Sequence, residues 1–104
     1  MNNSLVHGMQ HPEGGHIRIS KHPKDTFEGS CPLHKDCLEG MICIGAIKLR
    51  KNLDSVFECE NISDDDEIWE YIANYIAQLC INLLYLVSLE KIIIGINLIL
   101  HNLL

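Results

Sequence analysis

Residues 63–95 read SDDDEIWEYIANYIAQLCINLLYLVSLEKIIIG and carry the clearest structural signal in the chain. Ser63, followed by four acidic residues, supplies an N-cap and negative charge where a helix dipole favours them. Apolar side chains then recur close to the 3.6-residue helical period, at Ile68, Ile72, Ile76, Leu79, Leu83 and Leu86. The pattern predicts a long helix over residues 63–88.

A β-branched run follows this helix. Lys91 is followed by three isoleucines and then by Gly95, and this pattern predicts a buried strand over residues 91–96. A helix that leads into a buried strand is typical of an α/β protein. The predicted fold class is therefore α/β.

A membrane span is the alternative for part of the same stretch. Residues 71–89 carry no formal charge and are long enough to cross a bilayer. However, Asn74, Gln78 and Asn82 follow one another at four-residue intervals, which places three amides on one stripe of the helix. Such a stripe is costly in lipid and ordinary at the polar edge of a packed helix. We therefore expect no membrane span.

Length and charge limit the remaining possibilities. The chain has 104 residues, which is enough for one compact domain covering residues 1–104. A domain of this size has little stability to spare unless a metal or a partner adds to it. The net charge is −6 and the eight Lys and Arg residues are scattered, which argues against a nucleic-acid surface.

The cysteines indicate the compartment. Their number is five, which is odd, and residues 1–10 show no basic start followed by an apolar run of the signal-peptide type. We expect a reducing, cytoplasmic location, where closely spaced Cys and His are more often metal ligands than disulfide partners.

Residues 1–40 have the composition of a binding segment. They contain five of the six histidines, five of the seven glycines and all three prolines, which predicts turns and short strands around a site. Residues 16–20 (HIRIS) alternate apolar and polar side chains, as a short strand does. The apolar residues 41–49 are predicted to begin a helix.

A metal-ligand pattern lies within this segment. Cys31, His34 and Cys37 are each separated by two residues, a spacing that lets three side chains converge on one Zn²⁺ ion. A fourth ligand is available from four upstream histidines: His7, His11, His16 and His22. His16 is favoured because it begins the predicted strand. The alternative is a solvated histidine and two free thiols.

The other three cysteines are not expected to react. Cys43 and Cys80 lie in apolar runs and are predicted to be inert core residues. Cys59 lies between Glu58 and Glu60, which disfavour its thiolate.

Several motifs in the first half of the chain resemble the central block of the fructokinases of the ROK family of sugar kinases. They are HPEGGH at residues 11–16, HP at 22–23, DTFEG at 25–29, CPxHxxCLEG at 31–40 and GAI at 45–47. The resemblance continues through residues 69–86, the long helix of the family, and residues 92–95, the strand that leads to its glycine-rich turn.

The resemblance implies a fold and a site. The fold would be part of the second lobe of the actin-like, ribonuclease H-like ATPase fold, with a zinc-binding loop. Substrate-binding residues would be Glu13, His16 and Glu39, which hold a fructose or related hexose, and Gly95 would belong to the nucleotide turn. Structural zinc would be bound by His16, Cys31, His34 and Cys37. The reaction would be phosphoryl transfer from MgATP to fructose.

Three other acidic residues are expected to be solvated: Asp25, Glu28 and Asp36.

Departures from the family pattern limit what these 104 residues are expected to do. The Asp-x-Gly-Gly-Thr phosphate loop and the upstream aspartate base have no counterpart here, and Ile96 and Asn97 follow Gly95 where the family has further glycines. We expect a sugar- and zinc-binding part that is inactive alone, with a complementary kinase half or a second copy as partner. The alternative is a zinc-stabilised structural module or a decayed gene product without catalysis. ROK repressors add a helix-turn-helix region that has no counterpart in this sequence.

Overall fold

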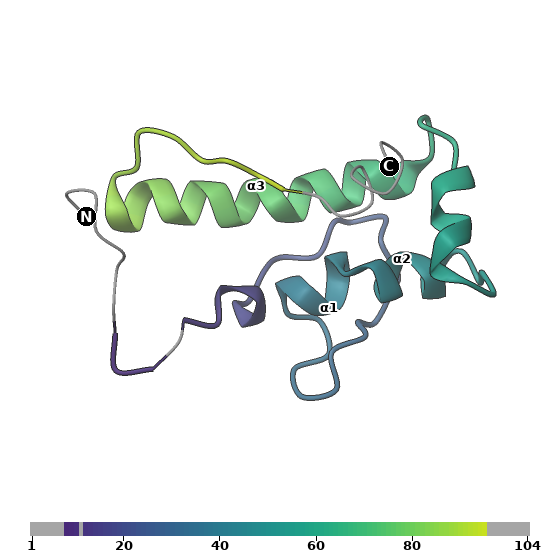
Figure 1. Ribbon diagram of the computed structural model, residues 1–104, viewed down its shortest axis with the longest axis horizontal. Helices are drawn as coiled ribbons and strands as arrows, with labels where there is room; N and C mark the ends of the chain where they lie inside the picture. Colours follow the sequence, from purple (N-terminus) through teal and green to yellow (C-terminus); the bar gives the residue numbers. More distant parts are fainter. Residues whose placement is uncertain (1–7, 11, 96–104) are drawn as a thin grey trace.

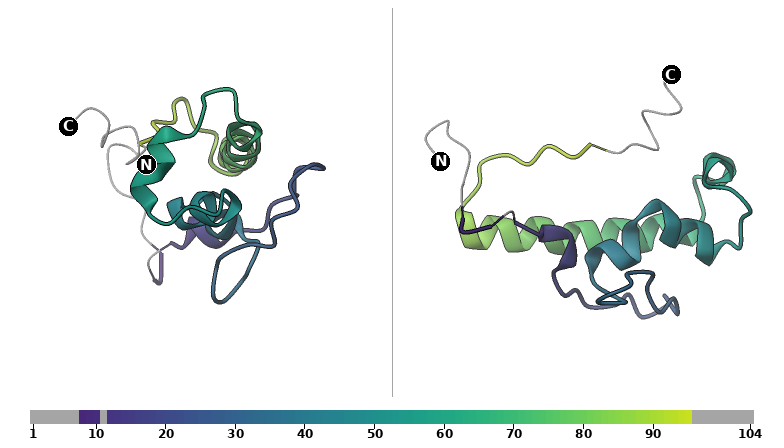
Figure 2. Two further views of the ribbon diagram at one scale, coloured as in Figure 1. Left: turned by 90° about the vertical axis from the view of Figure 1, so that its right-hand side faces the viewer. Right: turned by 60° about the horizontal axis from the view of Figure 1, so that its bottom comes forward.

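The computed structural model describes residues 8–10 and 12–95 of the chain. Its elements, in chain order, are the 3-10 helix η1 (Gly14–His16), α1 (Leu38–Ile42), α2 (Ile44–Arg50), the 3-10 helix η2 (Val56–Asn61) and α3 (Glu67–Val87). Helix α3 runs along the length of the molecule, and α1 and α2 lie beside its N-terminal half (Figure 1). The left view of Figure 2 shows the same two layers with α3 seen end-on.

Helix α3 begins four residues later than the sequence predicts. Ser63 caps a preceding turn, since its hydroxyl accepts from the Asp65 N–H at 3.2 Å. The N-cap is Asp66, whose carboxylate accepts from the Ile68 N–H at 2.9 Å. The helix ends at Val87, where Ser88 adopts a left-handed conformation with φ of 54°. The long helix itself is therefore present, with a different capping residue.

Neither predicted strand is formed in the described residues. Residues 17–20 and 91–95 are extended or irregular and pair with no neighbouring strand. A strand needs a partner for its backbone hydrogen bonds, and the apolar run at 92–94 is not buried, since Ile93 is 88% exposed. The last residue of the predicted strand, Ile96, lies outside the described residues. The α/β class is thus not seen in this part of the chain, which is mostly helical.

Two small apolar clusters hold the helices together. The first joins α1 to α3 through four buried residues, Leu38, Met41, Tyr71 and Tyr75. The second joins α2 and η2 to the start of α3 through Ile47, Cys59 and Ile68. The region predicted to begin a helix, 41–49, thus spans the end of α1 and most of α2, which are separated at Cys43.

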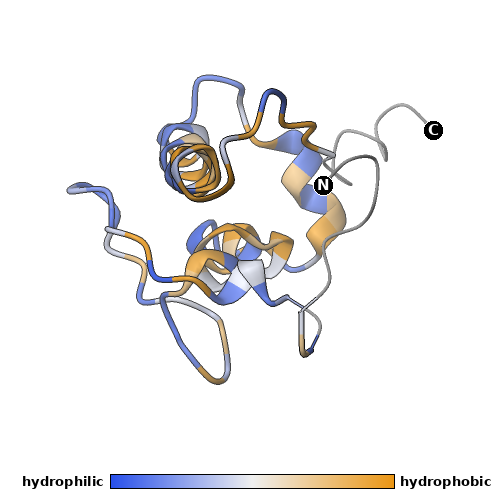
Figure 3. Ribbon diagram, turned by 90° about the vertical axis from the view of Figure 1, so that its left-hand side faces the viewer, coloured by the Kyte–Doolittle hydropathy of each residue, from blue (hydrophilic) through white to orange (hydrophobic). Residues whose placement is uncertain are grey.

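The end of α3 beyond Leu79 is not covered by these clusters. Large apolar side chains there are exposed, among them Tyr85 at 86% and Leu86 at 81%. Figure 3 faces this end of the helix and shows apolar residues around it. After Ser88 the chain turns and runs back in the opposite direction (Figure 1). Among the described residues, no helix combines the length and hydropathy needed to span a bilayer.

Candidate functional site

The loop at residues 31–37 is closed by its own backbone. The Cys31 N–H donates to the Lys35 carbonyl at 3.2 Å, and the Lys35 N–H donates to the Cys31 carbonyl at 3.0 Å. Lys35 has a φ of 58°, in the left-handed region, which turns the chain sharply. The turn brings His34 back over Cys31, with Nδ1 at 3.7 Å from the Cys31 Sγ.

Two glycines let the rest of the chain approach this loop. A Cβ added at Gly29, whose φ is 106°, would lie 2.1 Å from the Lys35 carbonyl oxygen, and one added at Gly40 would lie 1.9 Å from the same atom. Both contacts are impossible for a real side chain, so only glycine fits at either position. Because Gly40 belongs to α1, this close approach places the loop on the start of that helix, where Cys37 is the fully buried N-cap residue.

His16 completes a cluster of four predicted ligands. It ends η1, and its Nδ1 lies 3.3 Å from the His34 Nδ1, 3.6 Å from the Cys37 Sγ and 3.8 Å from the Cys31 Sγ. The donor atoms of all four residues lie within 4.8 Å of one another. Tetrahedral zinc with bonds of about 2.0–2.3 Å requires ligand atoms about 3.3–3.8 Å apart. The separations from His16 and the one between Cys31 and His34 all fall in this range, so the donor set could hold a zinc ion.

The two thiols of the cluster differ in their environments. The backbone N–H of His34 donates to the Cys31 Sγ at 3.4 Å, and mainly this contact lowers the pKa of Cys31 to about 6. Burial raises the pKa of Cys37. A thiolate is the form that binds metal. The lowered pKa of Cys31 therefore favours its metal-binding form.

The two predicted sugar-binding carboxylates lie on the other side of the His16 ring. The Nε2 atom of His16 is 3.7 Å from a carboxylate oxygen of Glu13 and 3.7 Å from one of Glu39. The side chains of Glu13 and Glu39 are 73% and 56% exposed, so their oxygens are accessible to a ligand. Ionised carboxylates accept hydrogen bonds only, which suits them to bind hydroxyl groups. One histidine thus contacts both the metal cluster and the carboxylate pair.

The remaining predicted residues lie elsewhere or outside the described part. His22 contacts the Tyr71 ring, with centroids 4.8 Å apart, and approaches Glu70, so it does not join the cluster. His7 and His11 are outside the described residues. Gly95 is exposed, and a Cβ added there would meet nothing within 4 Å. The two positions after it, Ile96 and Asn97, also lie outside the described residues.

One buried polar network is centred on Asp25, a residue that was expected to be solvated. Asp25 is buried and pairs with Arg50, with 2.9 Å between Oδ2 and Nη2. The Tyr75 hydroxyl donates to the same carboxylate at 2.6 Å. The expectation for Asp25 was wrong because a carboxylate can be buried where donors from distant segments converge on it. The only hint in the sequence is that Tyr71 and Tyr75 share one helix face.

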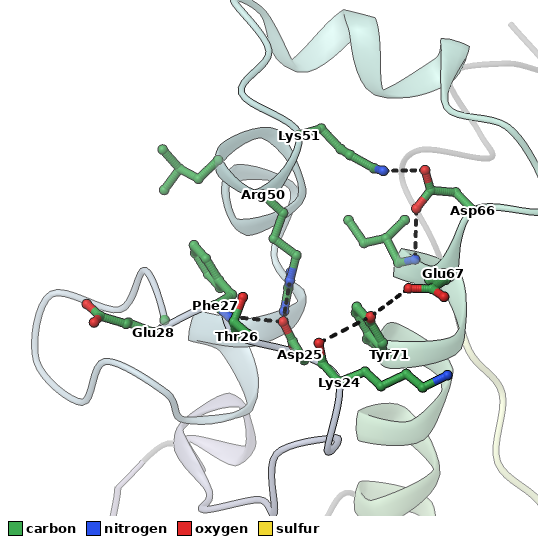
Figure 4. A pocket seen from close by; sticks show the side chains of 13 residues that line it. Lys24, Asp25, Thr26, Phe27, Glu28, Arg50, Lys51, Asp66, Glu67 and Tyr71 are labelled. Carbon is green, nitrogen blue, oxygen red and sulfur yellow. Dashed lines mark hydrogen bonds and ion pairs between the residues drawn. The ribbon is translucent and has the colours of Figure 1, made fainter.

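Asp25 and Arg50 of this network line a cavity of about 620 Å³ between α2 and the start of α3 (Figure 4). Charged residues of the wall are paired across it, as Lys51 is with Asp66 and Arg50 with Asp25. Arg50 Nη1 is buried without a hydrogen-bond partner among the described residues, and the guanidinium carbon lies 4.6 Å from the centroid of the Phe27 ring. The aromatic face offers this cation a favourable contact.

Glu28 at the rim is exposed, as expected. Asp36, expected to be solvated, is instead partly buried and paired with Arg18.

Of the three cysteines outside the cluster, only Cys59 lies in the core. Cys59 is buried, and burial, with Glu58 adding to it, raises its pKa. Cys43 and Cys80 are half-buried rather than in the core. The Cys43 Sγ lies 3.3 Å from the Ser30 hydroxyl.

Comparison with known proteins identifies the family. The family model described as "ROK family" matches residues 1–103. The chain is 42% identical over 96 residues to a fructokinase of Lactococcus lactis subsp. cremoris, covering 90% of this chain and 31% of that protein. It is 37% identical over 93 residues to a fructokinase of Pediococcus pentosaceus, covering 89% of this chain and 31% of that protein. It is 35% identical over 97 residues to a fructokinase of Streptococcus mutans, covering 90% of this chain and 32% of that protein.

The chain therefore spans a little less than a third of the length of the relatives that it matches. Because the family model covers nearly every residue, the resemblance seen in the motifs is confirmed, and the chain belongs to the ROK family, whose fold is that of the actin-like sugar kinases.

Proposed function

We propose that these 104 residues form the sugar-binding and zinc-binding part of a fructokinase, which transfers a phosphoryl group from MgATP to fructose. The observation that carries this proposal is the position of His16 between two groups. Its Nδ1 faces Cys31, His34 and Cys37, and its Nε2 faces Glu13 and Glu39. Relatives described as fructokinases match 89–90% of the chain, which supports fructose as the substrate.

In this proposal each residue has a defined task. Glu13 and Glu39 accept hydrogen bonds from vicinal sugar hydroxyls and so orient the sugar ring. His16 is a ligand through Nδ1 and presents Nε2–H to the carboxylates, which fixes their direction. A zinc ion bound by His16, Cys31, His34 and Cys37 would supply structural rigidity. Gly95 would begin the turn that approaches the nucleotide in a complete kinase.

Phosphoryl transfer also needs a base and a phosphate-binding loop. The resemblance assigns neither to the 104 residues, so a polypeptide of this sequence alone is expected to bind sugar without turning it over. A complementary half of a kinase is the partner that would supply them. A coupled ATP-dependent assay with fructose, on pure material, is expected to show no activity above the enzyme-free rate.

Sugar binding is the direct test. Isotope-labelled, zinc-loaded chain is titrated with fructose while amide chemical shifts near Gly14, Gly15 and Gly40 are followed by NMR. We expect binding with a dissociation constant in the millimolar range, about −4 kcal/mol. Glu13→Gln and Glu39→Gln should each weaken it strongly because each removes a charged acceptor, whereas the exposed Glu28→Gln is the matched control.

The metal is tested separately by elemental analysis of protein purified without added metal. One zinc per chain is expected, and Cys37→Ser should lower that content. If zinc is bound but fructose shifts no amide of this segment, the sugar proposal fails. The second candidate, a zinc-stabilised module without catalysis, would then stand, since the buried Cys31 and Cys37 need no sugar to hold a metal.

A further inference from the structure

Arg18 connects the two segments that carry the metal ligands. It lies two residues after His16, and its guanidinium reaches the loop at residues 31–37. Arg18 Nη1 donates to the His34 carbonyl at 3.2 Å, and Nη2 pairs with Asp36 Oδ1. The hydrogen bond from Arg18 is the main reason why the pKa of Asp36 lies below its ordinary value. One side chain thus contacts the loop at two successive points.

Both contacts fall between two of the ligands. The first contact is to the backbone carbonyl of His34 itself. The second is to Asp36, which directly precedes Cys37. On the other side of Cys37, the Leu38 N–H donates to the Ile17 carbonyl at 3.0 Å. The segment that carries His16 therefore contacts the loop on both sides of Cys37, through the backbone of Ile17 and the side chain of Arg18.

Of the three ligands in the loop, His34 is the one that is exposed. Cys31 and Cys37 are buried and are placed by the packing of Gly29, Gly40 and α1, whereas His34 is exposed. His34 lies in a turn whose next residue, Lys35, has a left-handed backbone. A guanidinium with donors in a rigid planar fork can hold two acceptors at a fixed separation, which a lysine ammonium does less well.

We propose that Arg18 is a positioning residue for the metal site, holding the His34–Asp36 backbone against the segment of His16 so that the four ligands are already converged before an ion binds. This inference rests on the metal site of the proposed function. An outer-shell contact of this kind is worth about 10- to 100-fold in metal affinity. The Arg18 side chain is 63% exposed, so its ion pair should add little to the stability of the fold. A positioning role and a merely structural role therefore differ in what they predict.

The test measures metal binding by the 104-residue chain. Zinc affinity is obtained by competition with a chromogenic chelator, and Co²⁺ alone is used as a spectroscopic probe of ligand geometry. We expect Arg18→Ala to weaken zinc binding about tenfold and to shift the cobalt ligand-field bands, because His34 is held less firmly. Thermal unfolding of the metal-free chain should change little. Arg18→Lys, which keeps the charge but not the fork, should give an intermediate affinity.

A double-mutant cycle and a control complete the design. Asp36→Ala in the Arg18→Ala background should weaken binding less than Asp36→Ala alone, because the contact is already lost. Lys91→Ala, an exposed cation outside the cluster, should bind zinc like the unaltered chain. If Arg18→Ala loses its helical circular dichroism, Arg18→Lys decides the question.

The outcomes separate the two proposals. If the unaltered chain shows no thiolate-to-cobalt band, the metal site fails and the role of Arg18 fails with it. If the unaltered chain binds Co²⁺ and both Arg18 variants match it in zinc affinity and in spectrum, the role of Arg18 is overturned while the metal site stands. Additive effects in the Arg18–Asp36 cycle would also overturn it.

Discussion

The Tyr75 hydroxyl donates a 2.6 Å hydrogen bond to the carboxylate of Asp25, a residue 50 positions earlier in the chain. Arg50 donates to the same carboxylate from Nε at 3.3 Å and from Nη2 at 2.9 Å. Burial acts to raise the pKa of Asp25, but the hydrogen bonds from Arg50, Tyr75 and the Phe27 N–H outweigh it, and the pKa is lowered. The network ties the segment before the loop at residues 31–37 to α2 and α3.

Removing the tyrosine hydroxyl should therefore destabilise the fold. Tyr75→Phe keeps the ring in the core but takes one donor from a buried carboxylate, a loss of about 2 kcal/mol in the free energy of unfolding. Urea denaturation followed by circular dichroism measures this difference. Tyr85→Phe is the matched control, because the Tyr85 side chain is 86% exposed. Equal midpoints for Tyr75→Phe and the unaltered chain would contradict the prediction.

The same hydroxyl should make stability depend on alkaline pH. Burial, and then the hydrogen bond to Asp25, raise the pKa of Tyr75 to about 12, above the value of about 10 for an unfolded chain. The contribution is fully present below pH 10 and is lost as the pH rises through 12. The free energy of unfolding should thus fall more steeply between pH 10 and 12 in the unaltered chain than in Tyr75→Phe. Parallel pH profiles for the two proteins would rule this out.

The sequence predicts the local parts of this molecule well. The structure brings His16, Cys31, His34 and Cys37 together; three of these lie within seven residues, where spacing alone limits the geometry, and the family motif adds His16. The long helix was predicted because its apolar period persists over many residues. Its start was misplaced because Ser63 and Asp66 are both good caps, and the competing turn at Ser63 is not visible in the sequence.

Features that depend on distant segments were not predictable in the same way. The Asp25 network requires α2 and α3 to converge on one carboxylate, and no spacing rule encodes that convergence. Conversely, the apolar residues 92–94 have the composition of a buried strand, yet a strand forms only beside another strand. The described residues offer none to pair with it, so no strand is seen at residues 91–95.

Gly40 should be essential to the shape of the loop at residues 31–37. In Gly40→Ala the new methyl group would lie 1.9 Å from the Lys35 carbonyl oxygen, so either the loop or the start of α1 must move. We expect a loss of at least about 2 kcal/mol in the free energy of unfolding, together with weaker zinc binding. Gly14→Ala is the control, because a Cβ at Gly14 meets nothing within 4 Å. Both are measured by denaturation and by chelator competition; unchanged zinc affinity in Gly40→Ala would show that the contact does not shape the loop.

The exposed apolar surface at the end of α3 should make the isolated chain self-associate. Tyr85 and Leu86 are 86% and 81% exposed, and Ile93 in the segment that follows is 88% exposed. Neighbouring apolar side chains that remain in water favour association with another surface, since burial is worth about 25 cal/mol per Å². Sedimentation velocity at increasing concentration should therefore show species larger than the 11.8 kDa monomer.

Tyr85→Glu and Leu86→Glu together should shift the distribution toward monomer, because each places a charge in the contact. Met9→Glu makes the same chemical change at a side chain that is fully exposed near the other end of the chain, so it should leave the distribution unchanged. A chain that remains monomeric at millimolar concentration, or a Met9→Glu variant that dissociates as well as the double variant, would show that the end of α3 does not drive association.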